Sequence, residues 1–171
     1  RRPPISTLLP YTTLFRSANE KAFYDICSVS KSPIIATHSN TREKQNVERN
    51  LTNQQIRSIV HSGGLIGLVA VKKFIASNPN RQNSLELAQH ARAMKELVGV
   101  DYLCIGFDYM DFLKEPFGPH SMAIDLQDAS MSQNLVQSLV TVGFTIEEVK
   151  KIAYQNRSEE HTSELQSLSH L

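Results

Sequence analysis

The stretch LIGLVAV, at residues 65–71, decides the fold class of this 171-residue chain. Its residues are apolar throughout and do not alternate with polar ones, which is typical of a strand buried on both faces of a parallel sheet. Two similar runs flank it along the chain, SPIIAT at 32–37 and YLCIG at 102–106. Together the three runs predict parallel strands in the interior of an α/β protein.

Helical patterns separate and follow these runs. Thr52 with Gln55, and Thr145 with Glu148, have the spacing of capping boxes, and Ser84 is expected to cap the helix between them. Glycines stand where these helices should end. The expected helices span residues 20–31, 52–62, 84–98, 132–142 and from 145 onward.

The alternation of helices and buried strands predicts parallel βα units. Right-handed crossovers place the carboxyl ends of all such strands at one edge, so polar residues just past those ends should converge. His38 follows the first run and Asp108 follows the third. A doubly wound sheet fits the same pattern, but no GxGxxG follows a strand, so a dinucleotide site has no support.

Composition limits the partners of the chain. Eighteen Lys and Arg against seventeen Asp and Glu give a formal net charge of +1, which provides no field for gathering nucleic acid or an anionic membrane. Cys27 and Cys104 lack the short spacing of a redox or zinc motif and are interpreted as buried free thiols. No apolar run reaches the roughly 20 residues of a membrane span, and no signal-peptide pattern is present, so a soluble domain of unassigned compartment is expected.

The two ends differ from the interior. Residues 1–17 and 157–171 show no helical or alternating periodicity, and YTTLFRS at 11–17 and RSEEHTSELQS at 157–167 resemble in-frame translations of short sequencing adapters. We therefore exclude both ends from the fold, as one excludes an expression scar. The expected domain is residues 18–156.

Four blocks in order resemble the membrane dipeptidase (renal dipeptidase) family of zinc metallopeptidases. They are SPIIATHSN at 32–40, ERNLTNQQI at 48–56, VGVDYLCIGFDYMDF at 98–112 and NLVQSLVTVGFTIEEVKKIAYQN at 134–156. The family folds as a (β/α)₈ TIM-type barrel, and the blocks are similar to its C-terminal three βα units. The resemblance thus implies an α/β fold that is an incomplete barrel.

The resemblance also implies a site. His38 matches a histidine that binds one of two zinc ions, for which a neutral imidazole at a strand end is suited. Arg49 matches the arginine that recognises the substrate carboxylate, and its guanidinium can form two parallel bonds to a free peptide C-terminus. Asp108 matches an aspartate beside the metal-bound water, where a carboxylate can move protons. The implied activity of the intact enzyme is zinc-dependent hydrolysis of dipeptides.

This chain departs from the family in its metal ligands. The family's His-x-Asp pair and bridging glutamate precede the region present here, and the position of a further zinc histidine falls on Ser17. A catalytic zinc takes three protein ligands and a water, so we expect this fragment to be inactive, and its unpaired strand edges to make it aggregation-prone.

Two other interpretations stay open. One is a non-enzymatic α/β module that binds a small ligand at its strand ends. The other is a different metal-dependent hydrolase on the same barrel, which would keep His38 and Asp108 but not need Arg49. Three further histidines receive no site role: His61 as a charge at a helix C-terminus, His90 on a solvated helix face, and His120 in a loop.

Overall fold

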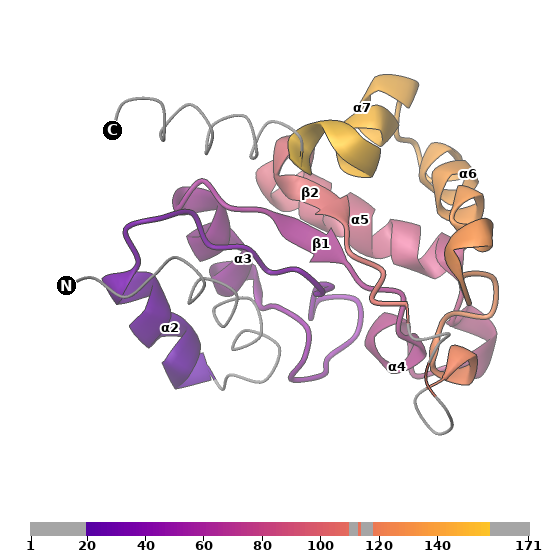
Figure 1. Cartoon of the computed structure of the whole chain (residues 1–171), viewed down its shortest axis with the longest axis horizontal. Helices are drawn as coiled ribbons and strands as arrows, with labels where there is room; N and C mark the ends of the chain where they lie inside the picture. Colours follow the sequence, from indigo (N-terminus) through magenta and orange to yellow (C-terminus); the bar gives the residue numbers. More distant parts are fainter. Residues whose placement is uncertain (1–19, 110–112, 114–117, 158–171) are drawn as a thin grey trace.

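The computed structural model describes residues 20–109, 113 and 118–157. Helices alternate with two short strands, which lie side by side in the middle of the molecule, with α2 and α3 at the left and α6 and α7 at the right of Figure 1. The α-helices and strands are α2 (Glu20–Val29), α3 (Asn53–His61), β1 (Ile66–Leu68), α4 (Lys72–Ile75), α5 (Ser84–Val98), β2 (Leu103–Ile105), α6 (Gln133–Thr141) and α7 (Ile146–Lys150). The 3₁₀ turns are η2 (Pro79–Arg81), η3 (Val100–Tyr102), η4 (Pro119–Ser121) and η5 (Ala129–Met131), and a π-helical turn, η6 (Lys151–Gln155), continues α7.

The sheet is parallel, as the apolar runs predict. β1 pairs with β2 so that Ile66 stands opposite Leu103, and Ala36 forms a parallel bridge to Ile66 on the other side of β1. The amide of Ala36 donates to the Leu65 carbonyl at 2.9 Å, and the Gly67 amide donates to the Ala36 carbonyl at 2.7 Å. The expected strand over 32–37 is therefore wrong in extent, because only Ala36 pairs with β1.

The helices pack in the order in which they follow one another along the chain. α2 contacts α3, α3 contacts α5, α5 contacts α6 and α6 contacts α7, while α5 and η6 also pack against β2. Each buries an apolar face, with Phe23, Ile59, Met94, Leu139 and Val149 among the core residues. Because Ala36, β1 and β2 run parallel, the carboxyl ends of these three segments lie at one edge of the sheet.

The local signals for helix starts are confirmed with one exception. Thr52 with Gln55, and Thr145 with Glu148, form complete capping boxes. The cap of α5 is not Ser84 but Asn83, whose side-chain oxygen accepts from the Glu86 amide at 3.0 Å. Asn83 has an extended backbone and Ser84 is already the first helical residue, so Asn83 occupies the cap position. Its side-chain oxygen reaches the third helical amide as readily as a serine hydroxyl would.

Other expectations have mixed outcomes. Cys104 is buried as expected, whereas Cys27 is only half-buried, and burial raises the pKa of the Cys27 thiol. Within the part of the chain that the structure describes, no helix has the length and apolarity of a membrane span. Residues 1–17, including Ser17, and all but the first residue of 157–171 lie outside the described residues.

Candidate functional site

The three parallel segments end at one edge of the sheet, and polar residues follow there. His38 comes two residues after the bridging Ala36, and Asp108 comes three residues after the end of β2. β1 leads through residues 69–71 into α4 at the same edge (Figure 1). The sheet thus positions residues that are far apart in the sequence as neighbours in space.

The ladder becomes irregular on both sides of β1 at this edge. Continued from the Ala36 bridge, a regular parallel ladder would pair the His38 amide with the Gly67 carbonyl, but the Ser39 amide makes that bond instead, at 2.7 Å. On the other side the Ala70 amide donates to the Phe107 carbonyl at 3.1 Å, where a regular ladder would use Gly106. Each outer segment therefore holds one extra residue, which is a β-bulge, a feature that re-aims side chains next to active sites.

The two bulges bring the His38 imidazole to the end of β2. Its Nδ1 lies 2.9 Å from the Gly106 carbonyl oxygen, the group that the bulge removes from the ladder. A carbonyl only accepts, so Nδ1 carries the proton and the neutral ring has its lone pair on Nε2. Nε2 lies 3.9 Å from Oδ1 of Asp108. Two of the three predicted site residues thus face each other.

Asp108 has an unusual backbone. Its φ is +62°, and it is the one residue other than glycine with positive φ among those that the structure describes. Aspartate tolerates this left-handed conformation better than most residues, and such conformations cluster at functional sites. Its side chain is 16% exposed and that of His38 is 29% exposed, so the pair is sheltered but reachable from solvent.

The pair fits a metal site only in part. A neutral imidazole that donates its other N–H to a backbone carbonyl is the usual arrangement of a zinc-binding histidine. Among the described residues, however, no three His, Cys, Asp or Glu side chains come together as a metal site requires. His38 therefore has the chemistry of a ligand, while the described residues supply too few partners to complete the coordination shell.

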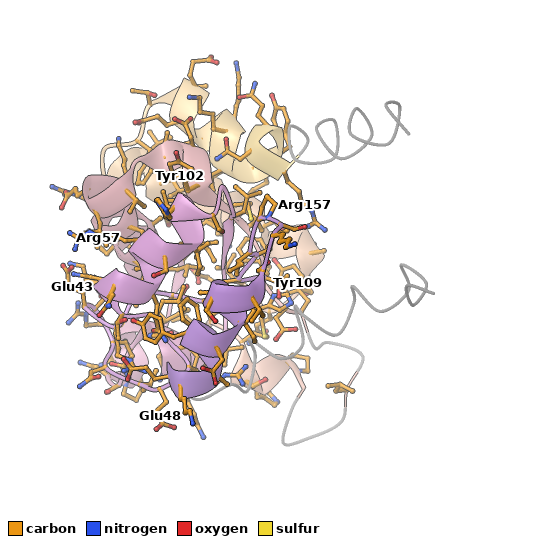
Figure 2. All side chains as sticks on the ribbon, turned by 90° about the vertical axis from the view of Figure 1, so that its left-hand side faces the viewer. Glu43, Glu48, Arg57, Tyr102, Tyr109 and Arg157 are labelled. Atoms are coloured by element: carbon orange, nitrogen blue, oxygen red, sulfur yellow. The ribbon has the colours of Figure 1, made fainter. Side chains whose placement is uncertain are left out.

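Arg49 lies in the loop that follows the first parallel segment. Its guanidinium carbon stands 5.4 Å from the centre of the Phe74 ring in α4, which is a cation–π contact. The neighbouring Asn50 is buried and donates to the Phe74 carbonyl at 2.8 Å. Glu43 and Glu48 of the same loop lie at the periphery of the molecule (Figure 2). Arg49 thus contacts α4, the helix into which β1 leads at the edge of the sheet where His38 and Asp108 lie.

The interpretation of His90 as a solvated residue is wrong. His90 is 0% exposed; its Nε2 donates to the Ile75 carbonyl at 2.9 Å and its Nδ1 accepts from the Thr41 amide at 3.3 Å. It joins α5 to α4 and to the loop of Arg49. The sequence does contain the signal, since His90 lies three residues after Leu87 and four before Met94, on the apolar face of the helix.

Burial lowers the pKa of His90, so stability should depend on pH. The unfolded chain takes up this proton near pH 6.5 and the folded protein only at lower pH, so the contribution is complete above 6.5 and declines as the pH falls. We expect the free energy of unfolding to fall by up to about 1.4 kcal/mol per pH unit below 6.5. Urea unfolding between pH 7.5 and 5 measures this slope. His90→Gln should flatten it and His61→Gln should not; equal slopes in all three proteins would contradict the assignment.

Comparison with known proteins gives the family. The sequence profile of the membrane dipeptidase family, peptidase family M19, matches residues 16–159. An uncharacterized protein in the pqqA 5′ region of Klebsiella pneumoniae is 29% identical over 141 residues, which cover 81% of this chain and 49% of that protein. The dipeptidase ataJ of Aspergillus terreus is 28% identical over 134 residues, covering 77% of this chain and 31% of its own length. The chain thus spans about half or less of these relatives.

Solved structures agree on the fold. A metallo peptidase from Rhodobacter sphaeroides, liganded with a phosphinate mimic of the dipeptide L-Ala-D-Ala, superposes with a TM-score of 0.71 at 22% identity, over 88% of this chain and 43% of that one. The probable dipeptidase PvdM from Pseudomonas aeruginosa gives 0.71 at 17% identity, over 88% of this chain and 51% of its own. With its profile match over most of its length and a mixed α/β fold like theirs, the chain belongs to the membrane dipeptidase family.

Proposed function

We propose that this chain is the part of a zinc-dependent dipeptidase that supplies one zinc ligand, the carboxylate-recognising arginine and the proton-transferring aspartate. The observation that carries the proposal is the 2.9 Å contact between His38 Nδ1 and the Gly106 carbonyl, because it leaves Nε2 unprotonated and turned toward Asp108. The family membership supports a metallopeptidase that acts on dipeptides.

The proposed roles follow from the chemistry of each group. His38 Nε2 would bind zinc, and the two ions expected in the intact enzyme would lower the pKa of a bound water and polarise the scissile carbonyl. Asp108 would carry a proton from the attacking water to the leaving amine. Arg49, which contacts the Phe74 ring, would bind the C-terminal carboxylate of the substrate and so favour dipeptides over longer chains.

We further propose that residues 18–156 form the C-terminal three βα units of a TIM-type barrel and that the flanking ends are translated adapter sequence. The parallel order of the Ala36 segment, β1 and β2, with successive helices packed on one another, supports the barrel assignment. The described residues bring one imidazole and one carboxylate together, whereas a catalytic zinc needs three protein ligands. The chain by itself is therefore expected to bind zinc weakly and to hydrolyse no dipeptide.

A zinc titration tests this function. The ring nitrogens of His38, observed by ¹⁵N NMR, should shift on addition of zinc, and His38→Gln should abolish this shift while His61→Gln leaves it unchanged. The zinc-loaded chain should not hydrolyse an L,L-dipeptide above the blank rate. If zinc leaves the His38 signals unmoved, the ligand role fails; if the chain hydrolyses the dipeptide, the incompleteness of the site is refuted.

A further inference from the structure

Asn40 replaces the backbone as the partner of β1 just beyond His38. Its side chain is 0% exposed, its Nδ2 donates to the Val69 carbonyl at 3.0 Å, and its Oδ1 accepts from the Val69 amide at 3.2 Å. A carboxamide has the same donor and acceptor as a peptide unit, so one side chain can make both bonds of a ladder rung. Asn40 therefore closes the ladder where the main chain has left it.

The two bonds from the Asn40 side chain to Val69 explain why the bulge lies at His38. In a regular ladder the Val69 amide would donate to the His38 carbonyl, which would hold His38 in line with β1. Because Asn40 occupies both Val69 groups, residues 37 and 38 are released from the ladder. The Thr37 carbonyl then crosses close over Gly67 and Gly106, where added Cβ atoms would lie 2.2 and 1.9 Å from its oxygen. The His38 imidazole thereby reaches the Gly106 carbonyl at the end of β2.

We propose that Asn40 is a positioning residue that sets the direction and the tautomer of the His38 imidazole. It does not touch the reacting atoms; by occupying Val69 it creates the bulge from which Nδ1 reaches the Gly106 carbonyl and Nε2 faces Asp108. Which ring nitrogen carries the proton is decided by the bond of the other one, so loss of the bulge changes the tautomer as well as the direction. The catalytic relevance of this positioning rests on the proposed zinc role of His38, but the positioning itself does not.

Asn50 provides a matched control. It is buried to the same degree as Asn40, and both asparagines donate to the Phe74 carbonyl, at 3.4 Å from Asn40 and 2.8 Å from Asn50. Asn50 otherwise donates to the carbonyls of Gln45, at 2.9 Å, and Thr41, at 3.5 Å, within its own loop and makes no bond to Val69. Its removal should cost stability without freeing Val69.

The test is the tautomer of His38 in the metal-free chain, read from ¹⁵N NMR of the imidazole and assigned by the loss of its signals in His38→Gln. The unchanged protein should hold His38 with the proton on Nδ1. Asn40→Ala should release the ring, and so should Asn40→Asp at a pH where the new carboxyl group is ionised, because a carboxylate still accepts from the Val69 amide but cannot donate to the Val69 carbonyl. The released ring should exchange between tautomers with the proton mainly on Nε2. Asn50→Ala should retain the Nδ1 proton.

A zinc titration separates this inference from the proposed function. If His38 binds zinc, Asn40→Asp should weaken zinc binding by about 10- to 100-fold, the usual effect of removing a group that supports a ligand. If zinc does not bind but the tautomer changes as expected, the positioning role stands and the zinc role fails. An Nδ1-protonated His38 in a folded Asn40 variant overturns the positioning role. Unfolding of both Asn40 variants but not of Asn50→Ala overturns it too, because Asn40 would then serve the fold as a whole.

Discussion

Gly106→Ala is expected to destabilise the protein by about 3 kcal/mol or more, the upper end of the cost of overpacking a core, and to separate His38 from the end of β2. A Cβ at this position would lie 1.9 Å from the Thr37 carbonyl oxygen and 3.1 Å from the Gly67 Cα. Both obstacles are backbone atoms, so no side-chain rotation relieves the clash. Urea unfolding measures the loss, and the ¹⁵N signals of His38 report the broken contact to the Gly106 carbonyl.

Gly99→Ala is the control for this prediction. Gly99 has φ +90°, which strains an alanine, but among the described residues no atom beyond its chain neighbours lies within 4 Å of its added Cβ. The expected cost is about 1–2 kcal/mol, that of a left-handed conformation alone. His38 should keep its signals in Gly99→Ala. Equal losses of stability in the two variants would show that the crossing of Thr37 over Gly106 is not as tight as the structure has it.

His90→Ala is expected to cost about 4 kcal/mol. The change leaves a cavity in the core and strands two buried backbone groups, the Thr41 amide and the Ile75 carbonyl, each of which costs about 1–3 kcal/mol when unpaired. Because Thr41 opens the loop that carries Arg49, the loop should also become accessible to limited proteolysis after Arg42 or Lys44. Chemical unfolding measures the stability, and peptide mapping locates the cleavage.

The exposed His61 supplies the comparison for His90. It lies in the last turn of α3, and His61→Ala should change the free energy of unfolding by less than about 0.5 kcal/mol. In His61→Ala, the loop that carries Arg49 should resist protease as it does in the unchanged protein. If His90→Ala proved as mild as His61→Ala, the burial of His90 and its two hydrogen bonds would contribute nothing measurable to the free energy of unfolding.

Much of the architecture is predictable because its causes are local. The capping boxes at Thr52 and Thr145 act over three residues, and the apolar run at 65–71 is contiguous. The placement of His38 and Asp108 past strand ends also follows from the sequence, since parallel crossovers bring those ends to one edge. Strand lengths were less predictable. The Ile34 amide donates to the Ser62 hydroxyl instead of to a neighbouring strand, so the apolar run at 32–37 is longer than the paired segment.

The sequence by itself determined the α/β class, the capping boxes of α3 and α7, the family and the three residues proposed to act. Tertiary structure alone decided how His38 is held, that Asn40 stands in for the backbone, and that His90 is buried. The physical reason is the span of the bonds involved: His38 to Gly106 crosses 68 residues, Thr41 to His90 crosses 49 and Asn40 to Val69 crosses 29. Local propensity and periodicity extend over a few turns at most, so such bonds become visible only when the sheet has brought their ends together.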